Sequence, residues 1–146
     1  MNHNLGKLLS LLLVMNIFQS CGVTYKSSDL FQNKESEKFY IQAQGFRYNG
    51  QLDSALFYFD KADKSAPLTA IILHERGLLK SNMKKYNEAL SDLNQSIELT
   101  KDQKQKEIRY ANRALTYMEM GNMAEACKDW QNSGATGKSY IDKYCK

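Results

Sequence analysis

The chain has 146 residues, of which 42% are hydrophobic and 25% charged, and its formal net charge is +4. This length suits one domain, and the composition excludes collagen-like, low-complexity and wholly disordered chains. The charge is too small to indicate a nucleic-acid partner without a basic cluster. A single proline in the whole chain favours helices over short strands and turns.

Residues 1–20 have the pattern of a secretory signal peptide. A polar start carrying Lys7 precedes an apolar run over Leu8–Phe18, and the small residue Ser20 ends the segment. The run is too short to cross a bilayer as a helix, which takes about 20 apolar residues. The alternative is a buried N-terminal helix, which the absence of a polar stripe disfavours.

Cys21 follows this leader directly. The run Phe18-Gln19-Ser20-Cys21 resembles the lipobox of bacterial lipoproteins, although Phe18 and Gln19 depart from its usual residues. The resemblance implies cleavage before Cys21, lipid on its thiol and new amine, and an outer-membrane lipoprotein of the cell envelope. Several acyl chains anchor a protein stably where one does not. The alternative is an ordinary secreted protein in which Cys21 is free or disulfide-bonded.

Residues 21–35 are expected to join this anchor to a folded domain. After Cys21 they are polar, with scattered apolar residues and no period, which is typical of a flexible tether.

From Ser36 onward the chain repeats itself. Small residues recur 34 positions apart, at Ala43 and Gly77, and again at Ala55 and Ala89. A third copy follows, in which Ala114 stands 37 positions after Gly77 and is equivalent to it. A 34-residue period of small and large residues is the pattern of the tetratricopeptide repeat.

The chain resembles tetratricopeptide repeat proteins over about three quarters of its length. The resemblance implies an all-α solenoid of three helix-turn-helix repeats, at about 36–69, 70–103 and 107–134, with a C-terminal capping helix at 137–145. Apolar residues at helical spacing predict the helices at about 36–48, 52–64, 70–82, 86–99, 105–119 and 123–132. The alternative is a generic helical bundle.

The C-terminal ending resembles that of tetratricopeptide lipoproteins of the Bacteroidetes kind. It comprises the run from Ala126 to Trp130, a Gly-rich turn and the closing Tyr144-Cys145-Lys146. This ending suggests a bridge between Cys127 and Cys145, each nine residues from Thr136 at the centre of the turn. An antiparallel hairpin would place them side by side, in a compartment that permits disulfides. The alternative is two separate buried thiols.

Signs of catalysis are scarce. His74 is the one histidine left once the leader is removed, and a single histidine does not indicate a metal site. There is no Gly-rich phosphate loop and no nucleophile elbow, and a dyad of His74 with Cys127 would have to join different repeats. The lysines near the turns lack interleaved aromatic residues. We therefore expect no enzyme, no cofactor, no metal, no nucleic acid and no small-molecule substrate.

The remaining candidate is a binding surface. Stacked repeats leave a concave groove lined by the first helix of each pair. Asn112 stands where peptide-binding members of the family often carry Asn, and Arg47 offers the one positive charge comparable to a carboxylate clamp. The side chains expected off the packing face are Tyr40, Gln44, Arg47, His74, Leu78, Ser81, Asn112, Leu115 and Met118.

These observations predict a membrane-anchored interaction module, an adaptor or assembly factor with a protein or peptide partner in the groove and the membrane at Cys21. Two other functions stay open: an envelope enzyme or enzyme subunit using His74, and a structural protein that self-associates through its repeat ends. The groove side chains could also merely pack helices together.

Overall fold

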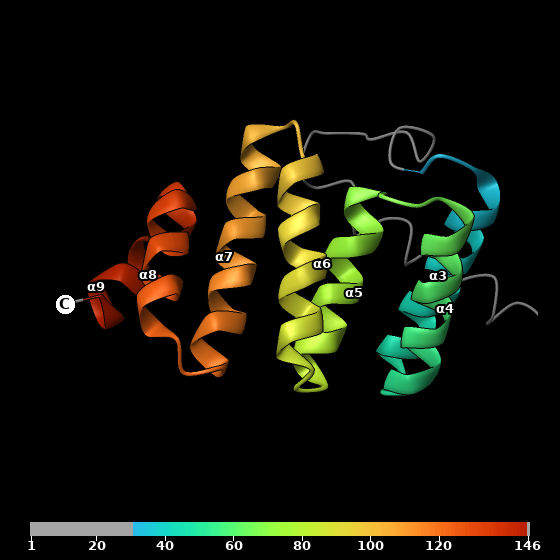
Figure 1. Cartoon of the computed structure of the whole chain (residues 1–146), viewed down its shortest axis with the longest axis horizontal. Helices are drawn as coiled ribbons and strands as arrows, with labels where there is room; N and C mark the ends of the chain where they lie inside the picture. The colour runs from blue at the N-terminus through green and yellow to red at the C-terminus, as the bar shows by residue number, and fades with distance from the viewer. Residues whose placement is uncertain (1–30, 146) are drawn as a thin grey trace, which may run out of the picture.

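A computed structural model of the chain describes residues 31–145, so the predicted leader, Cys21 and most of the predicted tether lie outside the described residues. Helices form three antiparallel pairs that stand side by side (Figure 1), and residues 31–145 contain no strand. None of these helices is long and apolar enough to span a bilayer. The elements are α3 (Lys34–Tyr48), α4 (Leu52–Ser65), α5 (Ala70–Asn82), α6 (Tyr86–Leu99), α7 (Gln103–Glu119), α8 (Met123–Asn132), the 3₁₀ helix η2 (Gly134–Gly137) and α9 (Lys138–Tyr144).

Helices α3 and α7 begin two residues earlier than expected. The side chain of Asn33 accepts a hydrogen bond from the Ser36 amide at 2.8 Å, and that of Asp102 accepts one from the Gln105 amide at 2.8 Å. Such N-caps satisfy the amides that a first helical turn leaves unpaired. The caps therefore set where these two helices begin.

The predicted tether is shorter than expected, because its last residues contact the first helix pair. Gln32 donates to the Pro67 carbonyl at 3.1 Å, and Asn33 donates to the Ser65 carbonyl at 2.8 Å. The ring of Phe31 lies 4.9 Å from that of Tyr40, measured between centroids. The prediction of a flexible tether is therefore wrong for residues 31–35.

Small residues let the two helices of each pair approach closely. A Cβ atom built on Gly77 would lie 2.8 Å from Cγ of Leu93, so this position of α5 has no room for a side chain. The equivalent small residues are fully buried in all three pairs: Ala43, Ala55, Ala89, Ala114 and Ala126. Larger side chains fill the space around them, with Phe59, Leu93 and Trp130 fully buried at equivalent positions.

Arginines join neighbouring pairs. Arg76 of α5 forms two hydrogen bonds of 2.7 Å to Asp92 of its own pair and contacts Asp63 of the preceding pair at 2.9 Å. Arg113, which stands 37 positions later, likewise binds Asp129 and reaches Asn94 of the preceding pair at 2.6 Å. These half-buried guanidinium groups tie three helices each.

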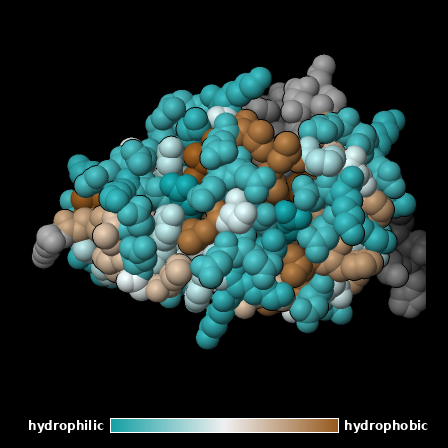
Figure 2. Space-filling model, viewed as in Figure 1, coloured by the Kyte–Doolittle hydropathy of each residue, from teal (hydrophilic) through white to brown (hydrophobic). Residues whose placement is uncertain are grey.

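The C-terminal pair is closed by η2 and α9. Tyr140 and Tyr144 stack on Trp130 with centroid distances of 4.9 and 5.8 Å, and Trp130 is fully buried. A Cβ atom on Gly137 would overlap the Trp130 carbonyl, so only glycine fits this turn. The expected capping helix is thus present, covering the end of the solenoid. Figure 2 shows a largely hydrophilic face, with hydrophobic residues in small areas between the helices.

Candidate functional site

The first helices of the three pairs, α3, α5 and α7, run in the same direction (Figure 1), so residues at equivalent depths face the same part of one surface. We call this surface the groove. Five of the nine predicted groove residues are joined there into one polar network by a residue that the sequence analysis did not select, Glu75. The five are Tyr40, Gln44, Arg47, His74 and Asn112.

Glu75 is the centre of this network. Its Oε2 atom lies 2.6 Å from Nη1 of Arg47 and 3.5 Å from Nε2 of Gln44, and its Oε1 atom lies 3.3 Å from Nδ1 of His74. Burial raises the pKa of Glu75, but the hydrogen bond and charge of His74, together with Arg47, outweigh burial and lower this pKa to about 2. Glu75 is therefore an anion throughout the physiological range.

His74 is buried, and both of its ring nitrogens are engaged. Nδ1 faces Glu75, and Nε2 lies 3.0 Å from Nδ2 of Asn112 on α7. Both ring nitrogens therefore have polar partners, and their donor and acceptor roles depend on the tautomer. The ring has no nitrogen left to activate a nucleophile.

Tyr40 and Gln44 complete the network on α3. The Tyr40 hydroxyl oxygen accepts a hydrogen bond of 2.8 Å from Nε2 of Gln44. Burial, followed by the nearby charge of Glu75, raises the pKa of Tyr40 to about 12. Tyr40 is therefore a neutral phenol whose ring packs against Phe59 in the core, at a centroid distance of 5.8 Å.

The other four predicted groove residues lie outside this network. Ser81 is buried and donates to Glu119 at 3.2 Å, while Leu78 is half-buried. Leu115 and Met118 pack against the core of the third pair. His74 and Ser81 are therefore buried, contrary to the prediction that all nine side chains lie off the packing face, whereas Leu78, Leu115 and Met118 are half-buried.

Sequence reasoning missed three charged residues of the first helices: Glu75, Arg109 and Glu119. Glu75 occupies the repeat position of Asn112, 37 residues earlier, so the repeat register could have found it. Arg109 is only 8% exposed and donates from Nε to the Thr100 hydroxyl at 2.6 Å. Burial lowers the pKa of Arg109, and the nearby Glu75 and Tyr40 oppose that shift. The sequence analysis had named Arg47 alone as a positive charge for this surface. Arg109 is a second cation, whose charge Glu75 and Tyr40 influence.

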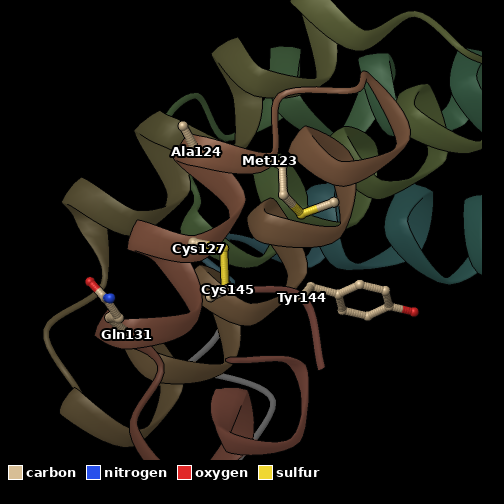
Figure 3. A pocket seen from close by; sticks show the side chains of 6 residues that line it. All are labelled: Met123, Ala124, Cys127, Gln131, Tyr144 and Cys145. Atoms are coloured by element: carbon tan, nitrogen blue, oxygen red, sulfur yellow. A yellow bond between two sulfur atoms is a disulfide. The ribbon is translucent and has the colours of Figure 1, made fainter. Parts of the chain in front are cut away.

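A pocket lies at the C-terminal cap (Figure 3). The sulfur atoms of Cys127 and Cys145 are 2.08 Å apart and join α8 to the residue that follows α9. The surrounding side chains are a mixture of apolar and amide groups and carry no charge: Met123, Ala124, Gln131 and Tyr144. Neither feature holds a metal site, since residues 31–145 contain no group of three or more His, Cys, Asp or Glu that could bind an ion.

Comparisons with known proteins identify the repeat. Residues 70–103 match the family model described as "Tetratricopeptide repeat". The "Tetratricopeptide repeat protein 36 homolog" of Drosophila melanogaster is 28% identical over 109 residues, 73% of this chain, and the matched region spans 58% of that relative.

Solved structures share the fold. The "N-terminal domain of stress-induced protein-1 (STI-1) from C.elegans" superimposes with a TM-score of 0.69 at 12% identity, over 78% of this chain and 99% of that one. The "TPR2AB-domain:pHSP90-complex of yeast Sti1" superimposes with a TM-score of 0.63 at 18% identity, over 74% of this chain and 48% of the other.

Three observations agree on the fold: the 34-residue period, the helix pairs and these superpositions. The chain folds as an all-α solenoid of the tetratricopeptide kind, and residues 70–103 are a tetratricopeptide repeat.

Proposed function

We propose that this protein is a protein-interaction module that receives a protein or peptide partner in the groove. The observation that carries the proposal is the exposure of two large apolar side chains on α3. Ile41 is 61% exposed and Tyr48 is 92% exposed. They stand 34 residues before Glu75 and Asn82, so the repeat register assigns them to the groove face.

The paired network beside these residues supports the same proposal. Glu75 contacts side chains of α3 directly and reaches Asn112 of α7 through His74, so the groove presents paired polar side chains next to exposed apolar ones. Interfaces combine such apolar anchors with a polar surround, and a fixed surface lowers the entropy lost on binding. The similar yeast Sti1 structure is a complex with pHSP90.

Variants of α3 test the proposal by crosslinking and pull-down from cell envelopes. Ile41→Ala and Tyr48→Ala are expected to weaken capture of the partner about tenfold, as loss of an interface anchor costs about 1–2 kcal/mol. Phe57→Ala on α4 is the matched control, since Phe57 is 54% exposed but lies on a second helix, away from the groove. Equal capture by all three variants and the parent would exclude the groove as the docking surface.

We also propose that the module is anchored to the outer membrane of a bacterial cell envelope through lipid on Cys21. The lipobox resemblance and the leader support this proposal, and both precede the described residues. The first described residues, at the start of α3, belong to the repeat domain, so the segment from Cys21 to Phe31 would connect it to the membrane.

Metabolic labelling with a fatty-acid analogue tests the anchor. Cys21→Ser is expected to abolish labelling and to release the protein from membranes, because the thiol that carries lipid is lost. Cys145→Ser is the matched control and should keep both labelling and membrane association. Labelling that persists in Cys21→Ser would contradict the anchor without affecting the proposal for the groove.

A further inference from the structure

The outer side of α3 is exposed, although the same side of the other first helices is packed. Its residues follow one another at spacings of three and four positions, so they share one side of the helix. We call this set the outer face of α3, and all of its members are exposed: Lys38, Ile41, Gly45 and Tyr48. Helices α3 and α4 form one end of the array, and α9 lies at the other (Figure 1).

In the other two pairs the equivalent face packs on the preceding pair. Leu79, which stands 34 residues after Gly45, is fully buried in one core cluster with Phe59 of the first pair. Thr116, a further 37 residues on, is 1% exposed. The outer face of α3 thus continues an interface that the chain forms twice, between α4 and α5 and between α6 and α7.

Nothing among the described residues requires a glycine at position 45. Gly45 lies inside a helix, where glycine is less favourable than alanine, and a Cβ atom built on it would meet no atom within 4 Å. Gly77 differs, because Leu93 of its own pair leaves no room for a Cβ atom there. A notch on an exposed helix suits the close approach of a second helix, since the distance between packed helices depends on the side chains at the contact.

The opposite end of the array is closed. Helix α9 covers α8 there, with Tyr140 stacked on Trp130, and a disulfide fixes the end of α9. A second copy therefore finds no open helix face there for a head-to-tail contact, which would build a filament. It can meet the outer face of α3 with the same face of its own α3, and this contact gives a closed dimer with two-fold symmetry.

The outer face of α3 is complementary to itself. Ile41 projects from it, and Gly45 leaves a notch about one helical turn further on. If two copies of α3 cross antiparallel about a two-fold axis level with Ala43, Ile41 of each copy meets Gly45 of the other, because both lie equally far from the axis. The same axis sets Lys38 opposite Tyr48, so that an ammonium group meets an aromatic ring and not a second cation.

We propose that the outer face of α3 binds a second copy of this chain, in an antiparallel dimer with Ile41 of each copy seated at Gly45 of the other. This inference rests on the proposed function, because it uses Ile41 and Tyr48 and names the protein partner that they take. The two C-terminal caps then lie at the far ends of the dimer, since α3 and α9 lie at opposite ends of each copy (Figure 1).

Sedimentation equilibrium of the full-length chain in density-matched detergent tests the dimer. The parent is expected to have twice the mass of one chain. Gly45→Leu keeps the fold, because position 45 has free space in the monomer, but it fills the notch and should raise the dissociation constant of the dimer about tenfold or more. Asn87→Leu adds the same side chain at an exposed site of α6 and is the matched control, which should remain dimeric.

Cysteine crosslinking tests the register of the two helices. In a Cys21→Ser background an introduced thiol is the only free one, because the other two cysteines are bonded. Chains with Lys38→Cys mixed with chains with Tyr48→Cys are expected to form disulfide-linked heterodimers on mild oxidation, whereas neither kind of chain forms linked dimers alone. Lys104→Cys, at an exposed site of α7, is the control and should stay unlinked.

Three results would overturn the proposal. A monomeric parent would exclude the second copy, a Gly45→Leu variant as dimeric as the parent would place the dimer contact elsewhere, and chains with Lys38→Cys linked to each other would exclude the antiparallel register. A monomeric parent whose pull-down is weakened by Ile41→Ala would leave the proposed function standing with a different partner. A dimeric parent with unchanged pull-down would instead reject the groove as the docking surface and retain the dimer.

Discussion

At the scale of single residues, Lys84 stands out for its backbone. Its φ is +61°, in the left-handed region that disfavours a residue with a Cβ atom. The equivalent turn positions of the other two pairs are Gly50 and Gly121, with φ of +74° and +84°. The second pair therefore adopts the same turn as its neighbours with a residue poorly suited to it.

Lys84→Gly is expected to stabilise the protein. Relief of the left-handed strain exceeds the extra entropy that glycine brings to the unfolded chain, so the free energy of unfolding should rise by about 0.5–1 kcal/mol. Urea unfolding followed by circular dichroism measures the change. Lys85→Gly is the control, because Lys85 has φ of −85° and gains no such relief. An unchanged or lower midpoint for Lys84→Gly would contradict the argument.

Glu75 is the residue on which the groove network depends. Its pKa in the folded protein is about 2, below the usual 4.5, so its ionised form stabilises the fold. This contribution is complete above about pH 4.5 and is lost as the pH falls through about 2. The network should therefore loosen in acid before the apolar core does.

Glu75→Gln is expected to lower the free energy of unfolding by about 1–3 kcal/mol at pH 7, because Arg47 loses its carboxylate partner. The difference from the parent should shrink steadily between pH 4.5 and pH 2. Chemical unfolding across this pH range measures it, with the exposed Glu98→Gln as control. Parallel curves for parent and Glu75→Gln down to pH 2 would show that the network does not hold the carboxylate ionised.

At the scale of elements, the cap depends on a covalent link as well as on packing. Helix α9 has seven residues, too few to be stable alone. Stacking of Tyr140 and Tyr144 on Trp130 holds one side of it, and the sulfur bridge from Cys127 to Cys145 holds its end. The bridge closes a short loop, with a sequence separation of 18.

Oxidised protein is expected to show no free thiol at these two positions. Mass spectrometry after alkylation without reduction checks the bridge, and two alkylated cysteines at 127 and 145 would refute it. Cys145→Ser should cost about 3 kcal/mol of stability, the loss expected for a loop of this size. Cys21→Ser, which leaves the bridge intact, serves as the control for the loss of a cysteine.

At the scale of the whole molecule, the arginines couple one helix pair to the next. Arg76 contacts Asp60 and Asp63 on α4 while also binding Asp92 on α6. In a linear array each pair contacts only its neighbours, so stability depends on such contacts between pairs. Arg113 plays the same part between the second and third pairs.

Arg76→Met is expected to uncouple the first pair from the others. Its removal leaves Asp60 and Asp63 of α4 without the cation they contact and leaves Asp92 of α6 with Lys80 alone, at a cost of about 3–5 kcal/mol. Hydrogen exchange should quicken in α3 and α4 far more than in α8. Arg113→Met is the matched variant, and its fastest exchange should appear in α7 and α8. Uniform acceleration in both variants would mean that the array unfolds as one unit.

The helices were largely predictable from the sequence, for a physical reason. The repeat places small residues at Ala43, Gly77 and Ala114, and a solenoid needs small residues wherever paired helices approach closely. The helix ends at Asn33 and Asp102 were misjudged by two residues, because a side-chain cap sets them and the apolar period does not show it. The cap helix was predictable from the apolar face that an end repeat exposes.

The position of the groove on the first helices was predictable, but the contacts between its side chains were not. Periodicity placed Tyr40, His74 and Asn112 on the first helices, yet it could not show that Glu75 joins them across three elements. Whether these side chains meet depends on how each helix pair is rotated relative to the next. The spacing of residues along the sequence does not encode that rotation. For the same reason His74 and Ser81 were expected to be exposed and are buried.

The sequence by itself determined the all-α class, the repeat register and the candidate positions of the leader and the cysteines, because each depends on residue types at fixed local spacing. Only the tertiary structure decided which charges meet. It paired Arg47 with Glu75, joined Arg109 to the Thr100 hydroxyl, and brought Phe31 to Tyr40. Such contacts join residues far apart in the chain, and their energies depend on burial and distance that arise only when the pairs stack.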